Sequence, residues 1–137
     1  VAWGPSKAGS WVFGAFVESV PRMVRKESSD RQYLEFVKED PIQVKSVPLE
    51  WVRALHTWYD KMADMPSCPA RVKVIQGTND TTLDWKFNVE FIREKFSNAE
   101  VILIEDARHE LLNESVDIRK KVFSEIGSYL GKINNND

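Results

Sequence analysis

An aspartate and a histidine each follow a run of β-branched and aliphatic residues in the C-terminal half of this 137-residue sequence. Asp80 comes after the run at 72–76, and His109 comes after the run at 101–104. Such runs, when turn-forming residues follow, are typical of buried strands. A carboxylate and an imidazole just beyond two strands are two of the three members of a hydrolytic Ser-His-Asp triad. We therefore expect Asp80 to orient the imidazole and His109 to act as a general base.

Each of these residues also has a plain structural interpretation. Asp80 could form an Asx turn that leads into the next helix, and a histidine after a strand is often only structural. Asp84 is the second candidate for the acid, although we expect it inside the start of that helix and pointing away from the strand edge. Asn79 is expected to shape the turn.

Two segments carry a resemblance to a known family. Gly77-Thr-Asn-Asp80 and Ala107-Arg-His109-Glu-Leu-Leu-Asn-Glu114 resemble the α/β-hydrolase superfamily, in particular its branch of lysophospholipases, monoacylglycerol lipases and serine aminopeptidases. In that family the acid follows the seventh strand and the histidine follows the eighth. The resemblance covers residues 66–131 well and residues 1–65 loosely, where family members carry a variable cap or lid.

The resemblance implies an α/β-hydrolase fold, of which this chain supplies the cap and the last two β/α units. It also implies that Asp80 and His109 are catalytic, and that the substrate is a small acyl ester or lipid such as a monoacylglycerol or lysophospholipid. Peptidases and thioesterases share this fold, so the fold alone does not choose the reaction. The neighbours of the histidine are expected to support it: Arg108 and Glu110 by ion pairs, and Asn113 and Glu114 by capping the last helix.

A nucleophilic serine is missing from the sequence. Ser10 comes closest to a Gly-x-Ser-x-Gly elbow, but Ala8 and Val12 stand where the sharp turn requires glycine, and Ser67 lacks both glycines. We expect the nucleophile and the oxyanion hole to come from an N-terminal segment of the same protein, and this chain alone to be inactive. The start at Val1, without a methionine, agrees with a fragment.

Residues 1–65 show helical periodicity broken by turn signals, with no convincing strand, and we interpret them as a helical cap or lid region. A first apolar helix over 11–20 should end at Pro21. Ser29-Asp30 should cap a second helix that ends at Asp40-Pro41. Pro48 should open a third helix with one apolar face. The aromatic residues of this region either line an acyl entrance or pack the cap onto the sheet; they are Trp11, Phe13, Phe16, Trp51, Trp58 and Tyr59.

Residues 66–137 alternate strands and helices, and we interpret them as the C-terminal part of the hydrolase core. Strands are expected at about 71–76 and 100–105, and helices at about 83–96 and 115–131, the last with Ser115 as N-cap. This order implies parallel strands joined by right-handed crossovers. Two parallel strands alone do not make a stable sheet that is buried on both faces, so partner strands should come from elsewhere.

Composition excludes several kinds of function. The net charge of −2 argues against a nucleic-acid surface, and no apolar run is long enough to span a membrane. The single cysteine, Cys68, should be a packed, inert thiol; it allows no internal disulfide and favours a reducing compartment such as the cytoplasm, although N-terminal targeting stays open. No cofactor or metal is expected, because a His-Glu-x-x-His site beginning at His109 would need a histidine where Asn113 stands, and only His56 remains.

Two further interpretations stay open. The chain could belong to a non-catalytic hydrolase-like module that binds an acyl ligand or a protein partner, in which case the elbow would carry glycine, alanine or asparagine in place of serine. It could also be a free-standing interaction domain, which should then be monomeric and free of an exposed sheet edge.

Overall fold

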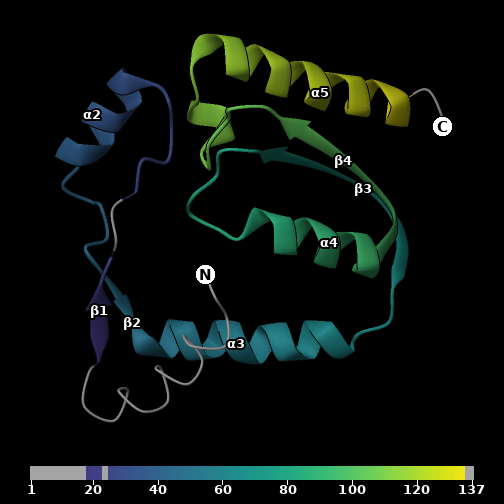
Figure 1. The fold of residues 1–137 in the computed structure, drawn as a ribbon, viewed down its shortest axis with the longest axis horizontal. Coiled ribbons are helices and arrows are strands. Elements are labelled where there is room, and N and C mark those ends of the chain that lie inside the picture. Colours follow the sequence, from purple (N-terminus) through teal and green to yellow (C-terminus); the bar gives the residue numbers. More distant parts are fainter. Residues whose placement is uncertain (1–17, 23–24, 135–137) are drawn as a thin grey trace. The chain divides into compact units, whose positions relative to one another are not determined.

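The computed structural model describes residues 18–22 and 25–134 (Figure 1). The chain divides into two compact units. The described part of the first unit is 18–22 with Pro41–Pro66; that of the second is 25–40 with 67–134. Residues 25–40, which we expected within the cap region, thus group with the strands of the second unit. The functional division into a cap over 1–65 and a core over 66–137 stays a prediction.

In the first unit, a short antiparallel pair precedes a long helix. Strand β1 (Ser19–Pro21) pairs with β2 (Ser46–Pro48), and helix α3 (Leu49–Asp64) follows at once. The expectation of no strand before residue 65 is therefore wrong, and residues 19–20 do not end a helix. Strands of three residues carry no readable periodicity, and their partner lies far away in the sequence. The rest of the helix predicted over 11–20 lies outside the described residues.

Helix α3 begins directly after Pro48, as predicted. Its apolar face is open within the described residues: Trp51 is 66% exposed, Leu55 50% and Trp58 55%. Together with three neighbouring side chains these residues line an apolar groove along the helix, made of Val47, Trp51, Val52, Ala54, Leu55 and Trp58.

The second unit contains the two β/α units that the sequence predicts. Strand β3 (Cys68–Gly77), helix α4 (Trp85–Lys95), strand β4 (Phe96–Ile104) and helix α5 (Val116–Asn134) follow one another, with a short 3-10 turn, η1 (Leu111–Asn113), before α5. Helix α2 (Arg31–Glu39) precedes them in this unit, and the side chain of Asp30 caps it, as predicted, by accepting from the amides of Gln32 and Tyr33.

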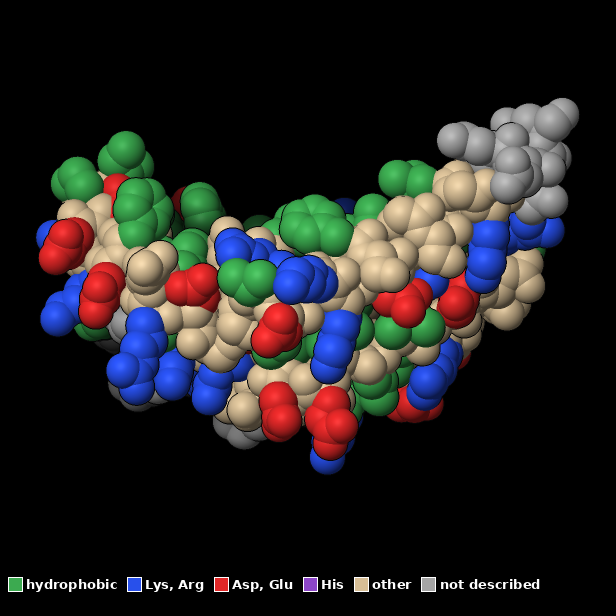
Figure 2. All heavy atoms as spheres, turned by 90° about the horizontal axis from the view of Figure 1, so that it is seen from above, with side chains coloured by type: hydrophobic (Ala, Val, Ile, Leu, Met, Phe, Trp, Pro, Cys, Tyr) green, Lys and Arg blue, Asp and Glu red, His purple; other side chains and the backbone are tan. Residues whose placement is uncertain are grey.

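Strands β3 and β4 are parallel, and Figure 1 shows α4 and α5 on opposite sides of them. On the α5 side the core is built around Ile104, Ala107 and Val122, each no more than 6% exposed. Lys73 on β3 and Glu125 on α5 form an ion pair at 2.7 Å that ties this helix to the sheet. Figure 2 shows basic and acidic side chains intermingled with hydrophobic ones on the face seen from above.

The prediction for Cys68 is wrong, because its side chain is exposed. Cys68 lies at the far end of β3, before an irregularity in the pairing with β4 between Cys68 and Arg71. Among the described residues, the Cys68 end of β3 is therefore not buried.

Gly77 at the end of β3 allows two loops to touch. A Cβ atom at this position would lie 2.3 Å from the carbonyl oxygen of Ala107 and 2.6 Å from that of Arg108. Real Cβ atoms do not approach backbone oxygens so closely, so the chain after β4 can pass over the end of β3 only because residue 77 has no side chain.

We predict that Gly77→Ala lowers the free energy of unfolding by about 1–3 kcal/mol, because the loop after β4 must move away. The measurement is urea-induced unfolding. Gly127→Ala is the matched control: Gly127 lies within α5, where a Cβ would meet nothing within 4 Å. That substitution should stabilise the protein by about 0.5–1 kcal/mol. Equal effects of the two substitutions would contradict the steric role of Gly77.

Candidate active site

Asp80 follows a turn that is fixed to the end of the neighbouring strand. After β3, the amide of Thr78 donates to the carbonyl of Ile104 (3.0 Å), and the amide of Asn79 donates to that of Ala107 (2.9 Å). The turn closes with a contact from the amide of Asp80 to the carbonyl of Gly77 at 3.4 Å. Asp80 therefore lies at the C-terminal edge of the parallel pair, where open α/β sheets place their ligand sites.

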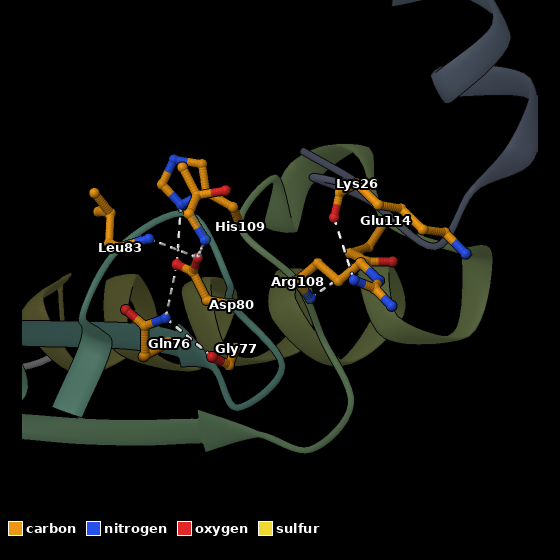
Figure 3. A network of polar contacts seen from close by, with 9 residues as sticks. Lys26, Gln76, Gly77, Asp80, Leu83, Arg108, His109 and Glu114 are labelled. Carbon is orange, nitrogen blue, oxygen red and sulfur yellow. Dashed lines mark hydrogen bonds and ion pairs between the residues drawn. The ribbon is translucent and has the colours of Figure 1, made fainter. Parts of the chain in front are cut away.

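The two oxygens of the Asp80 carboxylate have different partners, and its side chain is only 2% exposed. Oδ1 accepts from the amides of Thr82 (2.8 Å) and Leu83 (3.1 Å), which is the Asx-type turn into the following helix. Oδ2 lies 2.9 Å from Nδ1 of His109 and accepts from the amide group of Gln76 at 3.3 Å (Figure 3). The structural and the triad-like interpretations of Asp80 are thus compatible, since each uses one oxygen.

The ionisation of Asp80 suits this pairing. Burial raises the pKa of the Asp80 carboxyl, but the hydrogen bonds from His109, the amides of Leu83 and Thr82, and Gln76 together outweigh burial and hold the pKa below its ordinary value. An ionised carboxylate can only accept, so Nδ1 of His109 carries the proton. The neutral imidazole then has its lone pair on Nε2, and this side chain is 30% exposed. The pair can therefore take up a proton at Nε2 and stabilise the resulting imidazolium.

The loop that carries His109 is fixed on both sides of the histidine. Asp106 adopts a left-handed conformation (φ 61°), and its amide donates to Oγ1 of Thr78 at 3.0 Å. On the other side, the amide of Glu110 donates to the carbonyl of Glu27 at 2.8 Å. Ala107, fully buried between them, belongs to the core. The backbone on either side of the imidazole is therefore fixed by hydrogen bonds and packing.

The neighbours of His109 support the loop differently from the prediction. Among the described residues, hydrogen bonds and not ion pairs hold Arg108 and Glu110. Nη1 of Arg108 donates to the carbonyl of Lys26 (3.3 Å), and Oε2 of Glu110 accepts from the side chain of Asn113 (3.3 Å). The expected ion pairs were inferred from charge alone, and the carbonyl of Lys26 gives no signal in the sequence.

Glu114 is the supporting residue whose place the sequence analysis missed. We expected it to cap the last helix, and it does accept from the amide of Ser115 at 3.1 Å. It also binds the amide of Arg108 and, from the segment before α2, the amide and hydroxyl of Ser29. Ser29 and Glu114 are 85 residues apart, so no local pattern could have indicated the contact.

The remaining candidates have other places in the structure. Asp84 caps α4 by accepting from the amide of Phe87 at 3.2 Å, as expected for a residue at the start of a helix. Asn79 is exposed and contributes its backbone to the turn. His56 lies buried on α3, in the other compact unit. Within 18–22 and 25–134, no three His, Cys, Asp or Glu side chains are grouped as a metal site, and no helix is long and apolar enough to cross a membrane.

Two lipases are among the solved structures with a similar fold. A soluble variant of monoglyceride lipase from Saccharomyces cerevisiae, in complex with a substrate analog, matches with a TM-score of 0.74 and 20% identity over 94% of this chain and 49% of that one. The monoacylglycerol lipase of Paleococcus ferrophilus matches with a TM-score of 0.73 and 14% identity over 90% of this chain and 51% of that one. No family model matches the sequence, and no curated protein does.

The structural likeness confirms the predicted fold: the chain has the α/β-hydrolase fold, in part. It spans about half the length of the two lipases that it matches. At these levels of identity the likeness establishes the fold alone.

We predict a pH-dependent contribution of Asp80 to stability. Its folded-state pKa lies below 3.8, the ordinary value that the unfolded chain has. The contribution is therefore fully present above that value and is lost as the pH falls through the folded-state pKa. Asp80→Asn should lower the free energy of unfolding by about 1–3 kcal/mol at neutral pH, and the difference from the unsubstituted protein should shrink in acid.

Urea unfolding between about pH 7 and pH 3 measures this difference. Asp106→Asn is the matched control, because Asp106 is exposed and asparagine tolerates its left-handed backbone. A difference for Asp80→Asn that stays constant across this pH range would contradict the role of the buried charge.

Proposed function

We propose that this chain is the C-terminal half of a serine hydrolase that cleaves carboxylic esters. Asp80 and His109 are two members of its triad, and the nucleophilic serine is supplied by an N-terminal segment of the same protein, outside residues 1–137. The observation that carries this proposal is the 2.9 Å contact between Oδ2 of Asp80 and Nδ1 of His109. It leaves Nε2 available at the C-terminal edge of a parallel sheet, where a hydrolase of this fold holds its nucleophile.

The proposed mechanism follows from this arrangement. Nε2 of His109 takes the proton of the serine hydroxyl as the serine oxygen attacks the ester carbonyl carbon. The oxyanion that forms is stabilised by donors from the missing segment. His109 then gives its proton to the departing alcohol as the C–O bond breaks, which leaves an acyl-serine. Water, activated by the same imidazole, releases the carboxylic acid. Asp80 stays ionised throughout and stabilises the imidazolium.

The small size of the sheet supports the proposal of an additional, N-terminal segment. Among the described residues of this unit, β3 pairs only with β4, so the second edge of β3 has no described partner. Parallel strands are stable when they lie within larger sheets that are covered on both faces. The proposed N-terminal segment therefore supplies both the remaining strands and the nucleophile at their C-terminal edge.

A monoacylglycerol- or lysophospholipid-like ester is the proposed substrate. A monoglyceride lipase and a monoacylglycerol lipase are among the solved structures with a similar fold. The groove along α3 is apolar and has room for part of an acyl chain, with Trp51, Leu55 and Trp58 exposed on its wall. Burial of such surface against an acyl chain is favourable at about 25 cal/mol per Å².

We predict that a fluorophosphonate probe labels a single serine in the complete protein, and that this serine lies outside residues 1–137. Mass spectrometry of the digested protein locates the label. His109→Ala and Asp80→Asn should each lower kcat for a monoacylglycerol by about 10⁴-fold or more, because the base or its orientation is lost.

Asp84→Asn is the matched control for the acid. Asparagine caps a helix about as well as aspartate, so this variant should keep its activity. An unlabelled, folded complete protein whose elbow carries glycine, alanine or asparagine would contradict the enzyme and support a non-catalytic module that binds an acyl ligand or a protein partner.

A further inference from the structure

Glu114 is a fully buried carboxylate that joins three separate segments. Oε1 accepts from the amide of Arg108 at 2.7 Å. Oε2 accepts from the amide of Ser29 (2.9 Å), from the hydroxyl of Ser29 and from the amide of Ser115 (3.1 Å). The two oxygens therefore have different partners. Oε1 binds the residue before His109, and Oε2 binds the start of α5 and the segment before α2. Figure 3 shows Glu114 beside Arg108, next to the pair of Asp80 and His109.

The surroundings of the Glu114 carboxyl group favour its ionised form. Burial raises the pKa of the Glu114 carboxyl, but the hydrogen bonds from the Ser29 hydroxyl and from the amides of Arg108, Ser29 and Ser115 outweigh burial and lower the pKa below its ordinary value. Hydrogen bonds to an ionised acceptor are roughly twice as strong as those between neutral groups. Removal of the carboxylate would leave buried N–H groups without an acceptor, which costs free energy for each of them.

The bond to Arg108 bears directly on the imidazole. Arg108 is the residue before His109, so the place of its amide fixes the backbone from which the imidazole extends. Asp80 contacts only Nδ1 of that imidazole. The direction of Nε2 therefore depends on the backbone at residues 108–110, which is held by Oε1 of Glu114 and by the contact between the amide of Glu110 and the carbonyl of Glu27.

We propose that Glu114 is a positioning residue for His109. Its Oε1 fixes the amide of Arg108 and, through it, the imidazole relative to Asp80; its Oε2 ties the same loop to Ser29 ahead of α2. The inference rests on the proposed function, in which His109 is the general base. Glu114 does not itself touch the reacting atoms.

Glu114→Gln should break the contact with the amide of Arg108 and keep the contacts with Ser29 and Ser115. The carboxamide has one acceptor oxygen and one NH2 donor group. The oxygen is best placed where Oε2 accepts from Ser29 and Ser115, which turns the NH2 group toward the amide of Arg108. Two donors then face each other, so this variant keeps the links to α2 and α5 and loses the restraint on Arg108. Glu110→Gln is the matched control, because it makes the same chemical change in the same loop, where the side chain accepts from that of Asn113 and a carboxamide oxygen can accept the same hydrogen bond.

The experiment measures kcat, KM and the NMR signal of the proton on Nδ1 of His109 in the complete protein. For Glu114→Gln we expect kcat to fall by about 10- to 100-fold with KM changed by no more than about twofold, since a small displacement of a catalytic group has effects of this size. The downfield signal of the proton shared with Asp80 should broaden or disappear. Glu110→Gln should keep the values and the signal of the unsubstituted protein.

A Glu114→Gln protein with the kcat and the Nδ1 proton signal of the Glu110→Gln control would overturn the inference. If the unsubstituted protein hydrolyses no ester, the proposed function fails, and the NMR signal alone decides: its loss in Glu114→Gln supports the positioning role, and its retention overturns it. If Glu114→Gln does not fold, Glu114→Asp is measured by the same criteria, because it keeps the charge but shortens the reach toward Arg108 by one methylene.

Discussion

The close passage of the loop after β4 over the end of β3 is the constraint on which the site depends. The carbonyl oxygens of Ala107 and Arg108 occupy the space that a side chain at residue 77 would need. Because the two backbones touch there, Thr78 and Asn79 form hydrogen bonds that join the turn with Asp80 to the chain that leads into the loop with His109. The 2.9 Å contact between carboxylate and imidazole follows from this packing of backbone on backbone. Two buried carboxylates then hold the arrangement, since Asp80 fixes the ring and Glu114 fixes the loop that carries it.

Asp80 and Glu114 stabilise the loops of the site in the same physical way. Each is buried, each has its pKa lowered by hydrogen bonds that outweigh burial, and each uses its two oxygens for different partners. One oxygen of Asp80 organises the start of the next helix while the other meets His109. One oxygen of Glu114 holds Arg108 while the other reaches Ser29. Local structure and site geometry are therefore coupled through single side chains, and a change at either acid affects both.

The sequence predicted the parts of this arrangement that are encoded locally. The strands and helices of the second unit follow from apolar runs and periodicity, and Asp80 and His109 stand out because each follows such a run. The short strands β1 and β2 were missed, since three residues are too few for a period and their pairing is set by the fold. The role of Glu114 was missed for a similar reason, because Ser29 is 85 residues away. Cys68 was placed in the interior because a strand was recognised without knowing which end of it is covered.

The crystal structure of the complete protein after reaction with a fluorophosphonate would test the central claim most directly. We expect the modified serine to come from a segment outside residues 1–137, with a phosphonyl or serine oxygen within about 3 Å of Nε2 of His109 and with Asp80 accepting from Nδ1. A modified serine remote from His109, or an imidazole whose Nδ1 faces a group other than the Asp80 carboxylate, would contradict the central claim.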